Sequence, residues 1–392
     1  MNTPHFSSSQ FTSFRGVRIS LVFLLTGLLC ASCGAQSGDE LQAEYPQLAE
    51  LYNAFDVTHA ALLDAMAEIN ADPATQETRN QLHMQLSAKA NMSMAEYMRA
   101  STAHGDMSND GPYSELEGAA RRELNDLVRG RHSDVDAASA YMQSAALTAR
   151  AAEVIQYGRD FESRVWSIFA DPSASIESKR ETVDAAIQAY LADNLNSVSA
   201  LPKSAALWLA HDYVDAFRSA FPKLSGLSWA NQWLQLASLE AIILGQVDSQ
   251  FANSVDITLD RYWKKVGSDT GMSMFPTPSE MPSVPAIAPQ LYSQSPQAAI
   301  IIDNLNTLEF VIADIIAYPN LENRDAAIDV AVAEFTNKES NIVASIEYLS
   351  AVLRGGIYNQ GGPAIGELTV SERNRSRSAM DMQHNMTMSA PN

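Results

Sequence analysis

Five side chains near the end of the sequence offer its clearest metal chemistry. Met380, Met382, His384, Met386 and Met388 occupy every second position. In an extended chain, a period of two places all five side chains on one face, over about 27 Å at ~3.3 Å per residue. Thioether sulfur is a soft ligand that selects Cu(I), and imidazole also binds copper. The pattern predicts a copper-binding segment, and the alternative is a tail that contains methionine by composition alone.

Two histidines have acidic neighbours at helical spacing. His211 precedes Asp215 by one turn, and His59 has Asp64 and Glu68 on its C-terminal side. No second histidine stands at the spacing of an H-E-x-x-H zinc site. Pairs of this kind arise by chance in helical proteins, so we expect both histidines to be structural.

Signatures of nucleophilic catalysis and of phosphate binding are incomplete. The segment GSDTG at 267–271 has its serine in the second place, whereas a nucleophile elbow needs it in the third. The segment GPAIG at 362–366 is not followed by the lysine and hydroxyl residue of a phosphate loop. Because the sequence shows no set of acid, base and nucleophile, we predict that the protein is not an enzyme.

Both cysteines lie in one N-terminal segment, at Cys30 and Cys33. Arg15 and Arg18 come first, and residues 19–29 are then almost wholly apolar. An apolar run of this length is too short for a permanent membrane helix but is typical of a signal peptide. We therefore expect no disulfide, cysteine nucleophile or cysteine-bound metal in the folded part.

Small residues stand directly before the second cysteine, as Ala31 and Ser32 before Cys33. This arrangement resembles the lipobox of bacterial lipoproteins, with Cys30 at the position where leucine is usual. The resemblance implies a signal peptide over 1–32, cleavage before Cys33 and acylation of Cys33. Two or three acyl chains, at roughly 0.8 kcal/mol per buried methylene, would anchor the protein stably.

The residue after the modified cysteine is Gly34. In bacterial lipoproteins an aspartate there marks retention in the inner membrane. The resemblance therefore implies the outer membrane, facing the periplasm or the cell surface, with the periplasmic side of the inner membrane as the alternative. An ordinary secretory peptide, cut near Ala31 or Ala35, is the competing interpretation of the segment.

The chain is strongly acidic, with a formal net charge of −20 over 392 residues. Arg15 and Arg18 are the only charged residues of 1–32, so the remaining 360 residues carry −22. This charge repels nucleic acid and anionic lipid headgroups, so we expect no nucleic-acid partner. At 46% hydrophobic residues, the chain is long enough to bury a large core.

Apolar residues recur at steps of three and four nearly everywhere, which predicts an all-α fold. Leu48, Leu51, Phe55, Leu62 and Met66 draw one such stripe. The predicted helices cover 41–70, 75–103, 114–129, 134–170, 176–194, 203–221, 228–265, 297–317 and 323–353.

A short pattern ending in proline closes three of these stripes, at 69–73, 168–172 and 315–319. Proline disfavours the α conformation in the residue before it and suits the first turn of a following helix. We therefore predict antiparallel helical hairpins in a multi-helix bundle, either single or divided into two sub-bundles.

Composition divides the mature chain further. Residues 33–40 form a short tether and 41–265 the helical bundle, whereas 297–355 form a C-terminal hairpin packed on it. Between them, 266–296 is predicted to be a semi-extended connection, either a linker or a strap over the bundle, because of Pro276, Pro278, Pro282, Pro285, Pro289 and Pro296. Residues 356–392 are polar and glycine-rich, which predicts a disordered tail.

Aromatic residues gather around one predicted helix. Trp208, Trp229 and Trp233 lie close in sequence to Tyr213, Phe217 and Phe221. Such density is typical of the packed centre of a bundle, and an aromatic groove for an apolar or planar ligand is the alternative.

The stretch 236–246 is similar to the signature helix of imelysin-like lipoproteins, which are helical bundles of the outer membrane. Glu240, Gly245 and Gln246 match, but the glycine and histidine of the family fall on Gln235 and Ala237. Without the histidine, the metal role of the family is not carried over.

We therefore expect a lipid-anchored envelope lipoprotein that acts as a binding or scaffold component of an assembly or uptake system. Its expected partners are the membrane, through the lipid on Cys33, and other envelope proteins. Two alternatives stay open: a periplasmic copper-handling lipoprotein that uses residues 380–388, and an imelysin-like helical lipoprotein related to metal.

Overall fold

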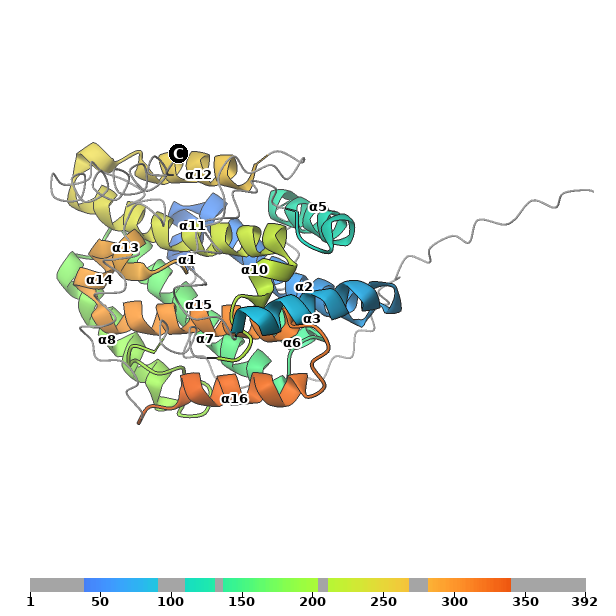
Figure 1. The fold of residues 1–392 in the computed structure, drawn as a ribbon. Helices are drawn as coiled ribbons and strands as arrows, with labels where there is room; N and C mark the ends of the chain where they lie inside the picture. The colour runs from blue at the N-terminus through green and yellow to red at the C-terminus, as the bar shows by residue number, and fades with distance from the viewer. Residues whose placement is uncertain (1–38, 91–109, 131–136, 204–210, 268–280, 340–392) are drawn as a thin grey trace, which may run out of the picture. The chain divides into compact units, whose positions relative to one another are not determined.

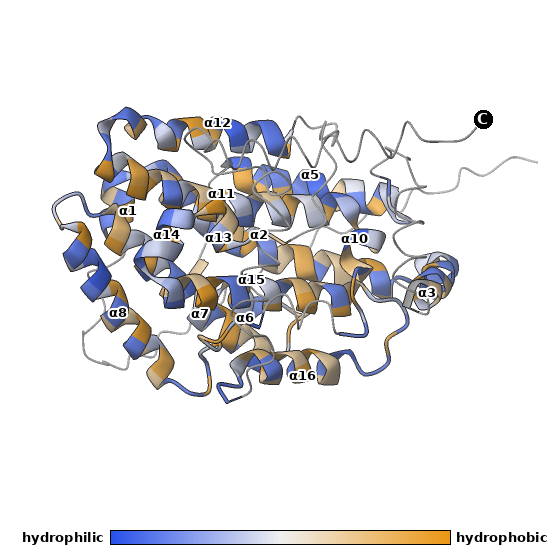
Figure 2. Cartoon of the chain, turned by 60° about the vertical axis from the view of Figure 1, so that its left-hand side comes forward, coloured by the Kyte–Doolittle hydropathy of each residue, from blue (hydrophilic) through white to orange (hydrophobic). Residues whose placement is uncertain are grey.

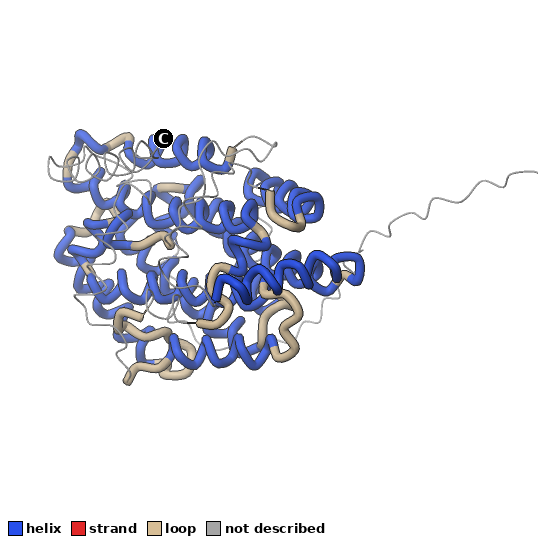
Figure 3. The backbone as a smooth tube through the Cα atoms, in the orientation of Figure 1, coloured by secondary structure: helices blue, strands red, loops and turns tan. Residues whose placement is uncertain are grey.

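Helices form every regular element of the residues that the computed structural model describes, which are 39–90, 110–130, 137–203, 211–267 and 281–339 (Figure 3). The all-α prediction is confirmed. The helices of more than ten residues are α2 (Pro46–Ala71), α3 (Gln76–Ala90), α5 (Ser114–Gly130), α7 (Ala149–Ala170), α8 (Ile176–Ala192), α11 (Pro222–Val247), α12 (Ser254–Val266), α15 (Pro296–Ala317) and α16 (Arg324–Thr336).

Two helices, α11 and α15, form the centre of the bundle. Nearly every residue of α15 from Ala298 onward is buried, and so is nearly every residue of α11 from Leu224 to Ile243. A helix that is buried on all sides must be surrounded by other elements. Accordingly, α15 packs against α2, α7, α10, α14 and α16, and α11 packs against α2, α5, α7 and α12 (Figures 1 and 2).

The three proline patterns all mark helix ends, as predicted. Helix α2 ends at Ala71, α7 at Ala170 and α15 at Ala317, and the residue after each has extended backbone angles before its proline. Consecutive helices then pack together, as α7 does on α8 and α15 on α16. Figure 1 shows α15 and α16 side by side and joined at one end. By their contacts, the described residues all belong to one compact unit.

Three predicted helices are interrupted or shorter, and a fourth, over 75–103, is followed only to Ala90, where the described residues end. The helix over 41–70 is two helices, α1 (Asp39–Glu44) and α2, because Pro46 begins the second. The helix over 75–103 begins as a 3₁₀ turn at 73–75, and its described part ends at Ala90. Within 203–221 the described residues form only α10 (Ala216–Ala220), and α16 ends at Thr336.

The predicted helix over 134–170 is wrong in its first half. A 3₁₀ turn at 137–139 and α6 (Ala140–Gln143) come first, and α7 begins only at Ala149. Asp64 of α2 accepts hydrogen bonds from the Ser144 hydroxyl and the Ala146 amide, and Thr148 caps α7. These bonds stabilise a loop between α6 and α7 that local helix propensity does not indicate.

The predicted helix over 228–265 is also broken. Helix α11 ends at Val247, and a 3₁₀ turn at 249–251 leads into α12. The side chain of Asp248 accepts a hydrogen bond from the Gln250 amide. The short side chain of aspartate can accept hydrogen bonds from nearby backbone amides, and these bonds compete with those that would continue the helix.

The proline-rich connection differs from its prediction where it is described. Residues 281–296 are not semi-extended but contain α13 (Val284–Ile287) and α14 (Pro289–Gln294), which pack on α11 and α15. Each of α13, α14 and α15 has a proline in its first turn. Proline there loses no hydrogen bond, so these prolines begin helices.

Buried carboxylates from other helices cap several helix N-termini. The amides of Lys223 and Leu224 donate to Glu117 Oε1 at 2.6 and 3.0 Å, and the Gln290 amide donates to Glu240 Oε2 at 2.9 Å. In the same way, Asp303 accepts a hydrogen bond from the backbone amide of Val284, and Asp314 accepts one from the backbone amide of Phe217. The local N-cap residue of each of these helices makes no capping bond through its own side chain. Long-range capping therefore fixes where α10, α11, α13 and α14 dock.

The aromatic residues around α11 pack into the core, as predicted. Trp229, Trp233, Phe217 and Phe221 are all buried, and Lys265 lies 4.6 Å above the Trp233 ring. Trp208 lies outside the described residues. In the part of the chain that the structure describes, no helix is both long and apolar enough to cross a membrane.

Candidate functional site: a polar cavity beside a buried arginine

The candidate site lies between α2 and α7, where polar residues share one face of each helix. Their spacing of three, four and seven residues places them in line on a helix. The residues are Tyr52, Asp56 and His59 on α2, and Arg159, Glu162 and Trp166 on α7. Glu309 of α15 and Gln235 of α11 complete the set.

Arg159 is the centre of this arrangement, and only 2% of its side chain is exposed. Its Nε donates to Glu309 Oε1 at 3.2 Å, and its Nη2 donates to Glu309 Oε2. Its Nη1 donates to Glu162, and Asp56 Oδ1 lies 3.9 Å from Nε. All three nitrogens of the guanidinium therefore already serve a carboxylate.

The network continues away from Arg159 through the histidine of α2. His59 Nδ1 lies 3.5 Å from Glu309 Oε2, and Asn231 Nδ2 lies 3.4 Å from His59 Nε2. Asn231 Oδ1 accepts a hydrogen bond from Tyr262 at 2.8 Å. Since the amide nitrogen of Asn231 is a donor, Nε2 of His59 acts as the acceptor and Nδ1 carries the hydrogen. His59 thus lies in a buried polar network that joins α2 to α11 and α15.

The three carboxylates around Arg159 differ in their affinity for protons. Burial raises the pKa of Asp56 well above its ordinary value, despite the nearby guanidinium. Burial also raises the pKa of Glu162, to about 7. Burial acts on Glu309 too, but Arg159 and His59 outweigh it and hold its pKa at about 2. Glu309 is therefore the permanent counter-ion of Arg159, whereas Asp56 and Glu162 favour a proton.

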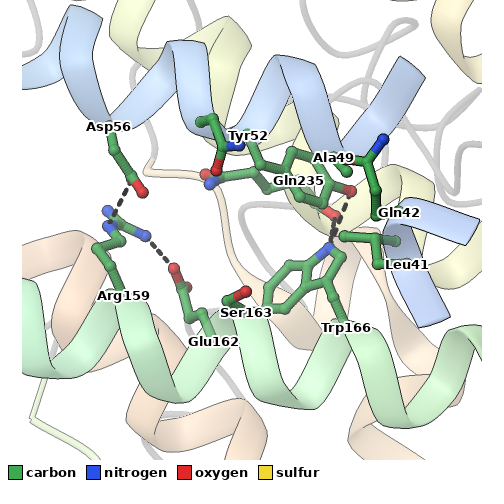
Figure 4. A pocket seen from close by; sticks show the side chains of 11 residues that line it. Leu41, Gln42, Ala49, Tyr52, Asp56, Arg159, Glu162, Ser163, Trp166 and Gln235 are labelled. Carbon is green, nitrogen blue, oxygen red and sulfur yellow. Dashed lines mark hydrogen bonds and ion pairs between the residues drawn. The ribbon is translucent and has the colours of Figure 1, made fainter. Parts of the chain in front are cut away.

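A cavity of about 110 Å³ opens beside this cluster, lined by Leu41, Gln42, Ala49, Tyr52, Asn53, Asp56, Arg159, Glu162, Ser163, Trp166 and Gln235. Figure 4 shows the charged groups at one end, where Asp56 and Glu162 lie on either side of Arg159. At the other end, Tyr52 and Trp166 pack edge to face with ring centroids 5.9 Å apart. The cavity thus joins a charged end to an aromatic end.

The aromatic end is held in place by hydrogen bonds. Trp166 Nε1 donates to the Tyr52 hydroxyl at 2.9 Å and to the backbone oxygen of Gln235 at 3.2 Å. Tyr52 also shares a hydrogen bond with Ser238 of α11. Three helices therefore fix the two rings, and the wall that they form is rigid.

Three buried oxygens around the cavity have no hydrogen-bond partner among the described residues: Asp56 Oδ1, Glu162 Oε1 and Gln235 Oε1. Glu162 and Gln235 are 4% and 6% exposed, so both side chains are more than nine-tenths buried. A buried acceptor without a partner costs about 1–3 kcal/mol. The site therefore favours an occupant that donates hydrogen bonds.

His211 pairs with Asp314 and not with Asp215, its neighbour in sequence. His211 Nε2 lies 3.3 Å from Asp314 Oδ2 of α15, and its Nδ1 accepts from the Tyr213 amide. Asp215 instead adopts a left-handed conformation just before α10. Asp64 and Glu68 likewise do not pair with His59, because Asp64 bonds the loop before α7 and Glu68 is exposed.

The other predicted site residues lie outside the described residues: Cys33, and Met380, Met382, His384, Met386 and Met388. Within the described ranges, no group of three or more His, Cys, Asp or Glu side chains is arranged to hold a metal ion.

The three residues that resemble the imelysin signature have structural surroundings. Glu240 caps α14, and Gln246 donates to the Phe169 backbone oxygen and accepts from Lys179. A Cβ at Gly245 would lie 3.3 Å from the backbone oxygen of Phe251, so this glycine allows the chain to turn closely after α11.

Comparison with protein-family models, with curated proteins and with solved structures found no match for this chain. The site is therefore interpreted from its geometry alone.

Proposed function

We propose that the protein is a lipid-anchored binding component of the bacterial cell envelope, and that the cavity between α2 and α7 is its solute site. The observation that carries the proposal is the cavity itself. Its wall combines fixed aromatic rings with buried oxygens that lack partners. Ligand sites typically combine apolar walls with a few placed polar groups in this way.

The sequence supports the location. Ala31, Ser32 and Cys33 favour an acylated cysteine, and Gly34 favours the outer membrane over the inner membrane. Binding without catalysis is favoured because Arg159 already binds the carboxylates of Glu309 and Glu162, and because His59 and His211 each lie beside a carboxylate of α15. Other envelope proteins, as parts of an uptake or assembly system, are the proposed partners.

Retention of a native solute tests this function. The protein would be purified from its own membrane and denatured, and the released small molecules compared by mass spectrometry with those from a Ser163→Phe variant. Ser163 is exposed and lines the cavity, so a phenyl ring there narrows its mouth. Arg164→Phe is the matched control, because Arg164 is exposed on the same helix but does not line the cavity.

The proposal predicts a compound that is present in the parent and in the Arg164→Phe protein and is depleted in Ser163→Phe. Identical small-molecule profiles for all three proteins contradict the proposed solute site.

Copper handling is a second candidate, which is favoured by the period of two in Met380, Met382, His384, Met386 and Met388. Replacing the four methionines by leucine keeps size and apolarity but removes the soft donors. We expect the substituted protein to bind less Cu(I) than the parent in competition with a chromogenic chelator. Equal binding by both proteins contradicts this second function.

A further inference from the structure

Three acceptor oxygens without hydrogen-bond partners belong to side chains that line the cavity. They are Asp56 Oδ1, Glu162 Oε1 and Gln235 Oε1, and among the described residues none of them accepts a hydrogen bond. These oxygens stand at the ends of side chains that line the cavity. Rotation about a terminal carboxylate or amide bond is soft, so small rotations turn the oxygens toward an occupant.

An anion is a poor occupant of the same cavity. Arg159 is the only cation among the lining residues. Its three nitrogens already donate to Glu309 and Glu162. Three of its five N–H groups therefore already have a carboxylate partner, and an anion would lie beside Asp56 and Glu162.

The charge balance also favours a cation. Three carboxylates, of Asp56, Glu162 and Glu309, surround the single guanidinium of Arg159. With all three ionised, these carboxylates carry two more charges than the guanidinium neutralises. Burial favours protons on Asp56 and Glu162, which would lower this excess, and a cation near the same oxygens would compete with these protons.

The aromatic end of the cavity also favours a cation. Tyr52 and Trp166 line the cavity opposite the carboxylates. Faces of aromatic rings attract cations, and tryptophan does so most strongly. The edge-to-face packing of these two rings fixes the tryptophan plane. Carboxylates at one end and aromatic rings at the other are a chemical combination that suits an ammonium group with a short apolar stem.

The volume limits the size of the occupant. Cavities of about 150 Å³ bind benzene, so a cavity of about 110 Å³ holds roughly four or five non-hydrogen atoms. We propose that the cavity binds a small primary ammonium ion, whose N–H groups donate to Asp56, Glu162 and Gln235 while its stem packs against Trp166. This inference rests on the proposed solute-binding function.

Titration calorimetry of the purified protein with propylammonium tests the inference. We expect saturable binding at one site. Tetramethylammonium has the same charge but no N–H group, and acetate has the opposite charge. Both should bind at least about tenfold more weakly, because a hydrogen bond to a charged group accounts for roughly that factor or more.

Asp56→Asn is the first variant, since it removes the carboxylate that a bound cation would keep ionised and preserves the size of the side chain. We expect roughly tenfold weaker binding of propylammonium, with a circular dichroism spectrum like that of the parent. Ser163→Phe is the second variant and should abolish binding through the mouth of the cavity. Arg164→Phe should bind as the parent does.

Protons should compete with the ammonium ion. Asp56 faces Arg159, Glu162 and Asp160 of α7 and Glu309 of α15, and Glu162 faces Arg159 and Glu309. Because burial raises the pKa of both acids, binding should strengthen from about pH 6 to about pH 8. Protons should be released on binding, which calorimetry in buffers of different ionisation enthalpy detects.

Three results would overturn the inference: no saturable binding of propylammonium, equal binding by the parent and Asp56→Asn, or binding of acetate or tetramethylammonium as tight as that of propylammonium. A native solute that is retained in the cavity but is neutral or anionic would refute the ammonium inference and leave the proposed function standing. Absence of any retained solute would refute the function itself.

Discussion

Arg159 shows how a single buried charge can organise the residues around it. It joins α7 to α2 and α15 through Asp56 and Glu309, and its guanidinium keeps Glu309 ionised in the core. Taking these charges out of water is costly, and the cost is offset only while each group keeps its partner. The ion pair of Arg159 and Glu309 therefore favours a single packing arrangement of α2, α7 and α15.

Replacing this arginine by methionine tests the role of the pair. Arg159→Met should lower the free energy of unfolding by about 3–5 kcal/mol, because it leaves buried carboxylates without a counter-ion. The double variant Arg159→Met, Glu309→Gln should be more stable than the single one. Arg164→Met, an exposed change on the same helix, should stay within about 0.5 kcal/mol of the parent. Urea denaturation measures all three, and a loss below about 1 kcal/mol for Arg159→Met would show that the pair is unimportant for stability.

The residues of the cavity could not be assigned from the sequence, since their partners are distant along the chain. Glu309 is 150 residues from Arg159, and Asn231 is 172 residues from His59. The sequence does carry one weak signal: Asp56 and His59 interrupt the otherwise apolar stripe of the helix that contains them. A polar residue on an apolar stripe indicates a buried polar group but does not identify its partner.

At the scale of the elements, close contact between α7 and α15 depends on Gly158. A Cβ at this position would lie 2.6 Å from Leu305 Cδ1 and 2.7 Å from Cδ2, and Leu305 is fully buried. The glycine thus allows the two helices to approach directly beside Arg159.

Gly158→Ala should destabilise the protein by roughly 1–3 kcal/mol, because overpacking outweighs the gain in helix propensity. Gly118→Ala is the matched control. Its new Cβ would meet only Arg122 Nη1, at 3.7 Å, so the change should stabilise by up to about 1 kcal/mol. Thermal melts of both variants give the comparison, and stabilisation by Gly158→Ala would contradict the close approach.

Helix ends could be predicted from the sequence where a nearby residue such as proline determines them. They could not be predicted where distant residues do so. The prolines after Ala71, Ala170 and Ala317 correctly ended α2, α7 and α15. The break before α7 was missed because Asp64, far along the chain, makes the bonds that stabilise it. Helices α13 and α14 were missed because prolines in short segments suggest extended chain as readily as helix starts.

For the whole molecule, buried acids make stability depend on pH. Burial raises the pKa of Glu117 to about 7 and that of Glu240 to about 8, above the ordinary value of 4.5. Glu162 behaves likewise, with a pKa of about 7. The folded state therefore binds these protons more tightly than the unfolded state. Stability should fall as the pH rises from about 4.5 to about 8.

Below that window the direction reverses, because the pKa of Glu309 lies at about 2 and its protonation weakens the pair with Arg159. We expect the highest stability at mildly acidic pH. Urea midpoints from about pH 3 to about pH 9 measure the profile. Glu240→Gln should flatten the decline between about pH 5 and about pH 8, and stability that increases over this range in the parent would contradict the account.

The proposed lipid anchor is also tested on the whole molecule. Cys33→Ala should abolish labelling with a fatty-acid analogue and release the protein from the membrane fraction, because the lipid is the proposed anchor. Cys30→Ala is the matched control and should leave labelling intact. Membrane retention and normal processing of the Cys33 variant would show that another segment anchors the chain.

The helical class of the whole molecule followed from its apolar periodicity, but the cavity did not. Periodicity reports which face of a helix is buried. The cavity depends on which buried faces meet, and that is set by long-range bonds such as those of Glu117, Glu240 and Arg159.

Solute binding in the cavity is the central claim, and the indole signal of Trp166 tests it most directly. The chain has five tryptophans, so nitrogen-15 labelling gives five indole signals, and a Trp166→Phe variant assigns the one at the cavity. Because Trp166 Nε1 donates to Tyr52 and Gln235 at the wall, propylammonium should shift this signal in a saturable way. The signals of Trp229 and Trp233, in the core away from the cavity lining, should stay in place. An unchanged Trp166 signal at saturating propylammonium, or equal shifts of all five, would contradict the claim.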